Sequence, residues 1–163
     1  MPGPTESVLD SRYGAFIIQG VSILAASRDV GNRPNLCRAC GCQVLEDRRV
    51  ELFVNSGRAQ QLLETVNISR TVAAVFSDSP THRTIQLKGD DAETAAFDSR
   101  HRALLDAYAD AFSATLVGLG YSESMARELV MTDPREVSVV RFTPTQIFDQ
   151  TPGPGAGEPM SAH

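Results

Sequence analysis

Apolar residues alternate with polar or small residues in several short segments of the chain, which is the pattern of half-buried strands. Turn-forming residues at 29–34 and 46–48 separate the first three segments, so we expect hairpin connections between them. Strands joined mostly by short turns predict an antiparallel sheet or small barrel rather than a doubly wound nucleotide fold. The expected strands cover residues 21–27, 36–45, 50–54, 71–76, 83–89 and 137–142, the last reaching at most residue 148.

Helical spacing of apolar residues marks the segments between these strands. The longest such stripe, over 93–119, predicts an amphipathic helix that packs outside the sheet. Ser56 has the residue type and position of an N-cap for the helix that follows the third strand. The expected helices cover residues 11–19, 58–66, 93–119 and 122–131.

A chain of 163 residues and 17.6 kDa has the size of one domain. We expect residues 11–148 to form this domain, with 93–131 as a helical excursion from the sheet. Residues 1–10, which contain Pro and Gly, are expected to form a flexible arm. The Gly- and Pro-rich residues 149–163 are expected to form a flexible tail.

The formal net charge of −5 and the pI of about 5.1 argue against a chain-wide surface for nucleic acid. Any anionic ligand must therefore be held locally by a few cations.

The N-terminal residues lack the pattern of a secretory signal, and the apolar segment 15–26 is too short to cross a bilayer. We expect a cytoplasmic protein with neither a membrane nor a nucleic-acid partner.

The turn after the third strand, residues 55–62, carries the most informative chemistry. A helix N-terminus offers unpaired N–H groups, Ser56 adds a hydroxyl, and Gly57 lets a ligand approach the backbone. Arg58 adds a bidentate cation, so the turn suits a phosphate. On spacing alone the simpler interpretation is favoured, in which Ser56 caps the helix and Arg58 is solvated.

Arg38 is a cation on an otherwise apolar strand. Period-two alternation places Cys40 and Cys42 on its face and Cys37 on the other. Arg38 either pairs with a carboxylate, which is the commoner case, or reaches an anionic ligand lying across the sheet. Because the cysteines lack a second metal-ligand pair, we expect buried free thiols rather than a metal site or a disulfide.

Polar residues also mark one face of the strand expected over 83–89, which His82 precedes. Thr84, Gln86 and Lys88 share this face, and Lys88 is the only lysine of the chain. Such a face is either solvated or contacts the edge of a heteroaromatic ring.

His101 lies on the apolar stripe of the long helix, where a packed and hydrogen-bonded core histidine is the expected role. The chain has no Gly-x-Ser-x-Gly elbow, phosphate-binding Gly-Lys-Ser/Thr loop, dinucleotide fingerprint or His-Glu-x-x-His motif. The familiar hydrolase and nucleotidase routes are therefore not supported.

The order of these segments resembles the pyridoxamine 5′-phosphate oxidase family in its broad sense, the FMN-binding split barrels. The resemblance covers about residues 15–91, and the ending of the chain is similar to that of an uncharacterised bacterial branch. The strings that carry it are residues 23–34, 53–62 and 83–89, with a weaker match at 137–142 and the ending at 148–155.

The resemblance implies an antiparallel split β-barrel with peripheral helices, mainly β within the α+β class. It implies a homodimer with FMN bound non-covalently in a groove between the subunits. Ser56 and Arg58 match positions that hold the phosphate, and Arg38 lies at or next to a basic position. Thr84 or Gln86 would contact the isoalloxazine edge. The candidate cofactor-binding residues are Arg38, Cys40, Asn55, Ser56, Arg58, Gln61, His82, Thr84, Gln86 and Lys88, with no metal ligand.

The chain also departs from the pattern of pyridoxamine phosphate oxidases. These enzymes carry two basic residues where this chain has Gly57 and Arg58, and a second basic residue where it has Cys42 or Gln43. Their arginine-bearing C-terminal segment is replaced here by glycine and proline. These differences argue against oxidation of vitamin B6.

A flavin-dependent oxidoreductase that takes hydride from NAD(P)H or a small organic donor is the function that the resemblance implies. The protein would supply binding and orientation, and no side chain stands out as a catalytic acid or base. One alternative is a non-catalytic module that binds flavin, deazaflavin or haem for storage or sensing. Another is an interaction domain without a cofactor, which ion pairing of Arg38 and Arg58 with the chain's own acids would favour.

Overall fold

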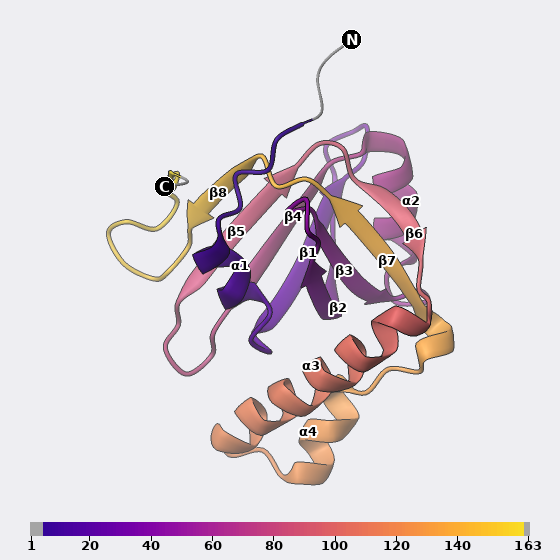
Figure 1. Cartoon of the computed structure of the whole chain (residues 1–163), viewed down its shortest axis with the longest axis vertical. Helices are drawn as coiled ribbons and strands as arrows, with labels where there is room; N and C mark the ends of the chain where they lie inside the picture. The colour runs from indigo at the N-terminus through magenta and orange to yellow at the C-terminus, as the bar shows by residue number, and fades with distance from the viewer. Residues whose placement is uncertain (1–4, 162–163) are drawn as a thin grey trace.

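A computed structural model describes residues 5–161, which form one curled antiparallel sheet with helices at its ends (Figure 1). The strand order is β6-β7-β3-β2-β1-β4-β5-β8. The strands are β1 (Ser22–Arg28), β2 (Pro34–Val44), β3 (Val50–Asn55), β4 (Val72–Ser77), β5 (Thr84–Gly89), β6 (Glu93–Ala96), β7 (Val137–Phe142) and β8 (Gln146–Asp149).

Two short connections show that the sheet closes into a barrel. In a flat sheet β5 and β6 would lie six spacings, about 29 Å, apart, yet the three residues that join them reach at most about 14 Å. The connection from β7 to β8 makes the same crossing, and the Thr145 N–H donates to the Lys88 carbonyl at 2.9 Å. The expected antiparallel split barrel is confirmed.

Gly89 lies where the two ends of the sheet meet. A Cβ at this position would be 2.6 Å from the Thr143 carbonyl oxygen and 2.7 Å from Cδ2 of Phe142. Only a residue without a side chain allows β5 to approach this closely.

We therefore expect Gly89→Ala to lower the free energy of unfolding by about 2 kcal/mol, the cost of overpacking a rigid contact. The matched control is Gly118→Ala at the end of the long helix, where a Cβ meets no atom within 4 Å. It should be neutral or slightly stabilising. Urea unfolding of both variants gives the measurement, and equal effects would contradict the closure.

The helices are α1 (Ser11–Ile17), α2 (Gln60–Ser69), α3 (Ser99–Gly118) and α4 (Glu123–Val130), followed by the 3-10 turn η1 (Pro134–Glu136). The buried side chains of α2, Leu62 and Val66, belong to the main core. The helices α3 and α4 form a pair beyond one end of the barrel (Figure 1). This pair bounds the candidate site described below.

The helix expected over 93–119 is wrong at its start, because residues 93–96 form β6 and pair with β7. The helix begins at Ser99 behind a capping box. The Asp98 carboxylate accepts from the Arg100 N–H at 2.9 Å, and Nδ1 of His101 accepts from the Asp98 N–H at 3.0 Å. Pairing with β7 therefore outweighs the helical spacing of the preceding residues.

The last expected strand ends at Phe142 rather than continuing to residue 148. Pro144 has no N–H for a ladder, and the Thr143 N–H donates to the Asp91 carboxylate at 2.8 Å. The chain turns here and starts β8 at the other edge of the sheet.

The expected common face of Cys40 and Cys42 is also wrong. A β-bulge between Ala39 and Gly41 changes the register of β2 against β3, so the alternation of side chains shifts by one residue. Cys42 thus packs with Cys37 in the main core, while Cys40 packs in a second cluster beside α3. All three are buried free thiols, as expected.

The described ends of the chain pack against the barrel. The Val8 N–H donates to the Pro144 carbonyl at 2.8 Å, and Leu9 is buried. In the tail, the Met160 N–H donates to the Ile147 carbonyl at 2.8 Å. The expected flexibility of the arm and tail stays a prediction, and residues 1–4 and 162–163 of these segments lie outside the described residues.

A buried carboxylate connects β3, β7 and α3. Glu51 is 1% exposed and accepts from the Arg141 guanidinium at 2.8 and 2.5 Å. It also contacts the Gln43 amide, and its Oε2 lies 3.1 Å from Nε2 of His101. Because Nδ1 of His101 accepts a backbone N–H, Nε2 is the donor to Glu51. His101 is therefore the packed, hydrogen-bonded histidine that the sequence predicts.

Candidate functional site

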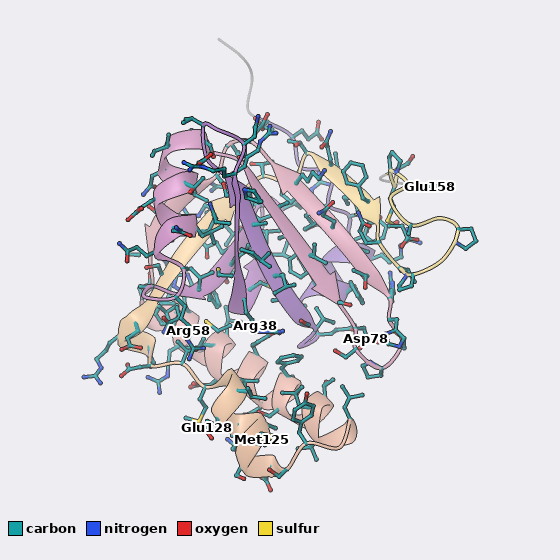
Figure 2. The ribbon with its side chains drawn as sticks, turned by 180° about the vertical axis from the view of Figure 1, so that it is seen from behind. Arg38, Arg58, Asp78, Met125, Glu128 and Glu158 are labelled. Atoms are coloured by element: carbon teal, nitrogen blue, oxygen red, sulfur yellow. The ribbon has the colours of Figure 1, made fainter. Side chains whose placement is uncertain are left out.

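A groove of about 230 Å³ lies between the ends of β2 and β3 and the pair α3 and α4. We call it the arginine groove, because Arg38 and Arg58 both line it. Figure 2 labels the two side chains. Four of the candidate cofactor-binding residues, Arg38, Cys40, Asn55 and Arg58, line it together with Tyr108 and Phe112.

Arg38 lies on the outer face of β2, opposite the barrel core. Its Nη1 donates to the Ser22 hydroxyl at 2.9 Å, and its guanidinium carbon lies 5.7 Å from the ring centre of Phe112. A neighbouring hydroxyl and an aromatic ring orient the guanidinium without neutralising it. Most of its donors remain free for an anion.

The turn that carries Arg58 is held by Asn55 and not by Ser56. The Asn55 side-chain oxygen accepts from the Arg58 N–H at 3.0 Å. The Ser56 hydroxyl shares a 2.7 Å hydrogen bond with Ser138 on β7. The expected N-cap at Ser56 is therefore wrong, and α2 begins later, at Gln60, with Ala59 at the cap position.

Neither groove arginine forms an ion pair within residues 5–161. Eight other arginines do pair with acids in this part of the chain. Two uncompensated guanidinium groups on one cavity create a local positive potential in a chain of net charge −5. This arrangement suits an anion that both can contact.

The groove offers no thiolate or phenolate at neutral pH. Burial raises the pKa of Cys37 and of Cys40 to about 11. Burial also raises the pKa of Tyr108, whose hydroxyl donates to the Val21 carbonyl at 2.8 Å. The side chains of the groove can therefore bind and orient a ligand, but these three supply no nucleophile.

The polar face expected on β5 exists, and it is the outer face of the sheet. Thr84, Gln86 and Lys88 alternate with the buried Ile85 and Leu87. The Thr84 hydroxyl shares a 2.7 Å hydrogen bond with Ser77. Its capacity for a ligand is thus partly used.

Strand register places Gln86 in the same row as Arg38. The row runs from Arg38 on β2 through Leu24 and Val75 to Gln86 on β5. Three inter-strand spacings separate its ends by about 14 Å. A ligand held at Arg38 and extended along this row would approach the polar face of β5.

The remaining candidate residues lie elsewhere. Gln61 lines a different cavity beside α2, and Lys88 lines a groove on the outer face of β4 and β5. His82 is exposed in the turn between β4 and β5 with a φ of +62°. The structure thus brings four of the ten candidate residues into one cavity and leaves six outside it, these three together with Ser56, Thr84 and Gln86.

Sequence reasoning missed the aromatic wall of the arginine groove. Tyr108 and Phe112 are four residues apart on the stripe of α3 and stack with ring centres 5.6 Å apart. Their spacing showed that they are buried, but no sequence signal shows that the cover of the core is also the wall of a groove. Ser22, the hydroxyl partner of Arg38, was likewise missed, because strand pairing alone brings it near.

The closed eight-stranded sheet is an antiparallel split barrel, and the arginine groove lies at its end. No protein-family model and no curated protein sequence matches the chain. Solved structures do match it, and they share this fold. No helix within residues 5–161 is long and apolar enough to cross a membrane.

Three solved structures illustrate the likeness. HupZ from Group A Streptococcus has a TM-score of 0.56 and 17% identity, covering 91% of this chain and 100% of its own. A candidate pyridoxamine 5′-phosphate oxidase from Lactobacillus delbrueckii has a TM-score of 0.53 and 16% identity, covering 90% and 97%. An F420 reductase has a TM-score of 0.54 and 13% identity, covering 85% and 98%. At these identities the likeness is one of fold.

Proposed function

We propose that this protein is a flavoprotein that binds the phosphate of FMN in the arginine groove and acts as an oxidoreductase on a small molecule. The observation that carries the proposal is the pair of arginines, Arg38 and Arg58, on one cavity without acid partners among residues 5–161. This finding counts against the interaction domain without a cofactor. Two of the solved proteins with this fold bear the names of redox enzymes.

The donor set of the groove fits a phosphate monoester. Arg38 on β2 and Arg58 in the turn after β3 supply charge-assisted hydrogen bonds, and Asn55, the last residue of β3, lines the same groove. A bound flavin would supply the two-electron chemistry. The residues of this chain would bind it, orient it and exclude water from one side. Cys37 and Cys40 would add no nucleophile, since burial keeps their thiols protonated at neutral pH.

We also propose that the protein is a homodimer and that the cofactor lies near the contact between its subunits. The outer face of β1, β2 and β4 carries the apolar side chains Leu24, Leu36 and Val75, and Leu36 is 63% exposed. Figure 2 looks onto this side, where no helix of the described chain lies across β4. A second copy of the chain would cover these side chains.

Sedimentation tests the dimer. Val75→Asp places a charge at the centre of the apolar face and should shift the protein to a monomer, since an unpaired charge in an interface is costly. Val30→Asp is the control, because Val30 is 89% exposed in the hairpin between β1 and β2. A wild-type protein that is monomeric at micromolar concentration would remove the subunit groove from the proposal.

Turnover distinguishes an enzyme from a storage or sensing module. The protein reconstituted with FMN is expected to be reduced by NADH or NADPH and reoxidised by an added acceptor over repeated cycles. Tight FMN binding without reduction by either nucleotide or by small organic donors would favour the non-catalytic module. The departures at Gly57, Cys42 and the tail make pyridoxamine phosphate a poor substrate in the same assay.

A further inference from the structure

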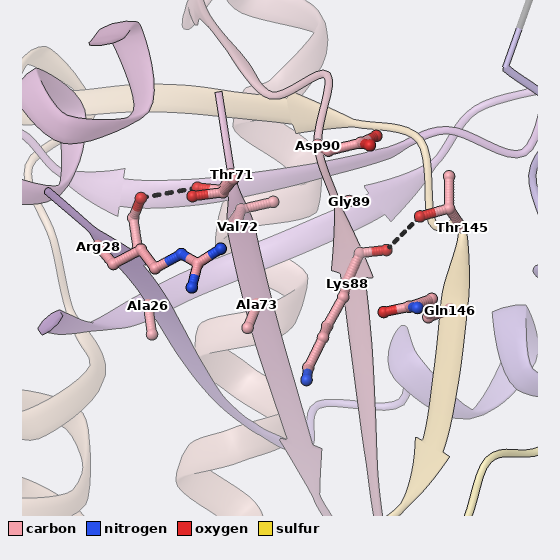
Figure 3. A pocket seen from close by; sticks show the side chains of 11 residues that line it. Ala26, Arg28, Thr71, Val72, Ala73, Lys88, Gly89, Asp90, Thr145 and Gln146 are labelled. Atoms are coloured by element: carbon pink, nitrogen blue, oxygen red, sulfur yellow. Dashed lines mark hydrogen bonds between the residues drawn. The ribbon is translucent and has the colours of Figure 1, made fainter. Parts of the chain in front are cut away.

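A second and larger groove of about 480 Å³ lies on the outer face of the sheet (Figure 3). We call it the Lys88 groove. Its floor is formed by small residues of β1 and β4, Ala26 and Ala73, and Lys88 stands beside them on β5. Arg28, at the end of β1, lines it from the opposite side.

Strand register explains why these residues meet. Ala26, Ala73, Lys88 and Gln146 are paired in one row across β1, β4, β5 and β8. Arg28 is two residues further along β1 and therefore on the same face. Figure 3 shows the Arg28 guanidinium and the Lys88 ammonium on the two sides of Ala73. The two methyl groups leave open space between the two cations.

Both cations lack an acid partner in the part of the chain that the structure describes. Lys88 is half-buried, and its ammonium lies 4.6 Å from the ring centre of Phe148. The ring positions the ammonium without cancelling its charge. Asp90 also lines the groove but forms no ion pair with Lys88, so the groove keeps one net positive charge.

The Lys88 groove is distinct from the arginine groove. The two cavities share no lining residue. Arg38 and Lys88 are separated by three inter-strand spacings, about 14 Å, and by two further residues along the strand. A ligand in the Lys88 groove therefore does not depend on FMN. Ala26 and Ala73 are two residues from Leu24 and Val75 on the same face, so in the proposed dimer the groove would border the contact between the subunits.

We propose that the Lys88 groove binds a small organic anion through a phosphate or carboxylate group. Arg28 and Lys88 hold the anionic group from two sides, and the Gln146 amide adds a polar contact at the β8 side. The apolar part of the molecule lies on Ala26 and Ala73. The groove would hold the substrate or a second ligand. Of the candidate residues predicted from the sequence, only Lys88 lines it.

Isothermal titration with two probes, inorganic pyrophosphate and citrate, tests the proposal and separates the phosphate from the carboxylate source. The protein is used as isolated, after saturation with FMN where FMN binds. We expect one probe to bind the wild-type protein. Lys88→Gln together with Arg28→Gln should weaken that binding at least tenfold, whereas Asp90→Asn should strengthen it, because the remaining acid of the groove is removed.

The control for the loss of a single charge is Arg12→Gln, which is compared with Lys88→Gln alone. Arg12 lines neither groove and has no acid partner within residues 5–161. Its substitution should leave the affinity within twofold of wild type, and Lys88→Arg should restore most of the binding. Unchanged thermal unfolding of the variants excludes loss of fold as the cause. Failure of both probes to bind, or equal weakening by the Arg12 and Lys88 substitutions, would overturn the proposal. Loss of binding only in Arg38 or Arg58 variants would assign the anion to the other groove and also overturn it.

Discussion

Replacing both Arg38 and Arg58 with glutamine is expected to weaken FMN binding about 100-fold or more. A hydrogen bond to a charged group contributes about 1.5–3 kcal/mol, and about 1.4 kcal/mol corresponds to a tenfold change in affinity. Losing one such bond from each arginine therefore costs at least two orders of magnitude. Quenching of flavin fluorescence in a titration gives the dissociation constants.

Two controls make this result specific for the phosphate. Arg102→Gln with Arg127→Gln removes the same number of charges from α3 and α4, where both arginines form exposed ion pairs, and should leave FMN affinity nearly unchanged. Riboflavin lacks the phosphate, so its affinity should be the same for wild type and the Arg38/Arg58 variant. An equal loss for FMN and riboflavin would show that the arginines do not contact the phosphate.

Glu51→Gln is expected to lower the free energy of unfolding by about 3 kcal/mol. The substitution keeps the shape of the side chain but turns an amide N–H or a weaker acceptor toward Arg141 and His101. Removing one partner of a buried ion pair costs about 3–5 kcal/mol, and we take the lower end because Arg141 is 27% exposed to solvent.

Urea unfolding measures this loss. The control is Glu93→Gln, because Glu93 is 46% exposed and contacts the same Arg141 at 3.6 Å. It should change the free energy of unfolding by less than about 1 kcal/mol. A Glu51→Gln variant as stable as the control would show that the network of Glu51, Arg141 and His101 does not hold α3 on the barrel.

The same carboxylate predicts a pH dependence. Burial alone would raise the pKa of Glu51, but hydrogen bonds from Gln43 and Arg141 and the charge of Arg141 outweigh it and hold the pKa below 4.5. The stabilisation is therefore complete above the unfolded-state pKa, about 4.3, and is lost as the pH falls through the lowered folded-state pKa. The difference in stability between wild type and Glu51→Gln should be constant near neutral pH and shrink in acid.

Local patterns predicted the strands well, because period-two alternation reports burial against one face. They failed where a contact distant in sequence decides the outcome. Residues 93–96 have helical spacing but pair with β7, and the bulge at Ala39 and Gly41 reverses the expected side of Cys42. No window of the sequence contains the partner strand that imposes either result.

The candidate site was predicted in the same uneven way. The residue types of Arg38, Asn55 and Arg58 pointed to an anion, and the structure brings all three to one groove. Ser56 looked identical to a cap in sequence, but β7 takes its hydroxyl through Ser138. Arg28 attracted no attention, because only the register of β1, β4 and β5 places it opposite Lys88.

The visible absorption spectrum of the purified protein, followed by heat release and mass identification of the bound molecule, shows directly whether the protein carries a flavin. A flavin site in the arginine groove predicts a yellow protein that releases FMN, or that takes up added FMN at one molecule per chain. A different chromophore, or a colourless protein that takes up no added FMN, would contradict the assignment of the arginine groove as a flavin site.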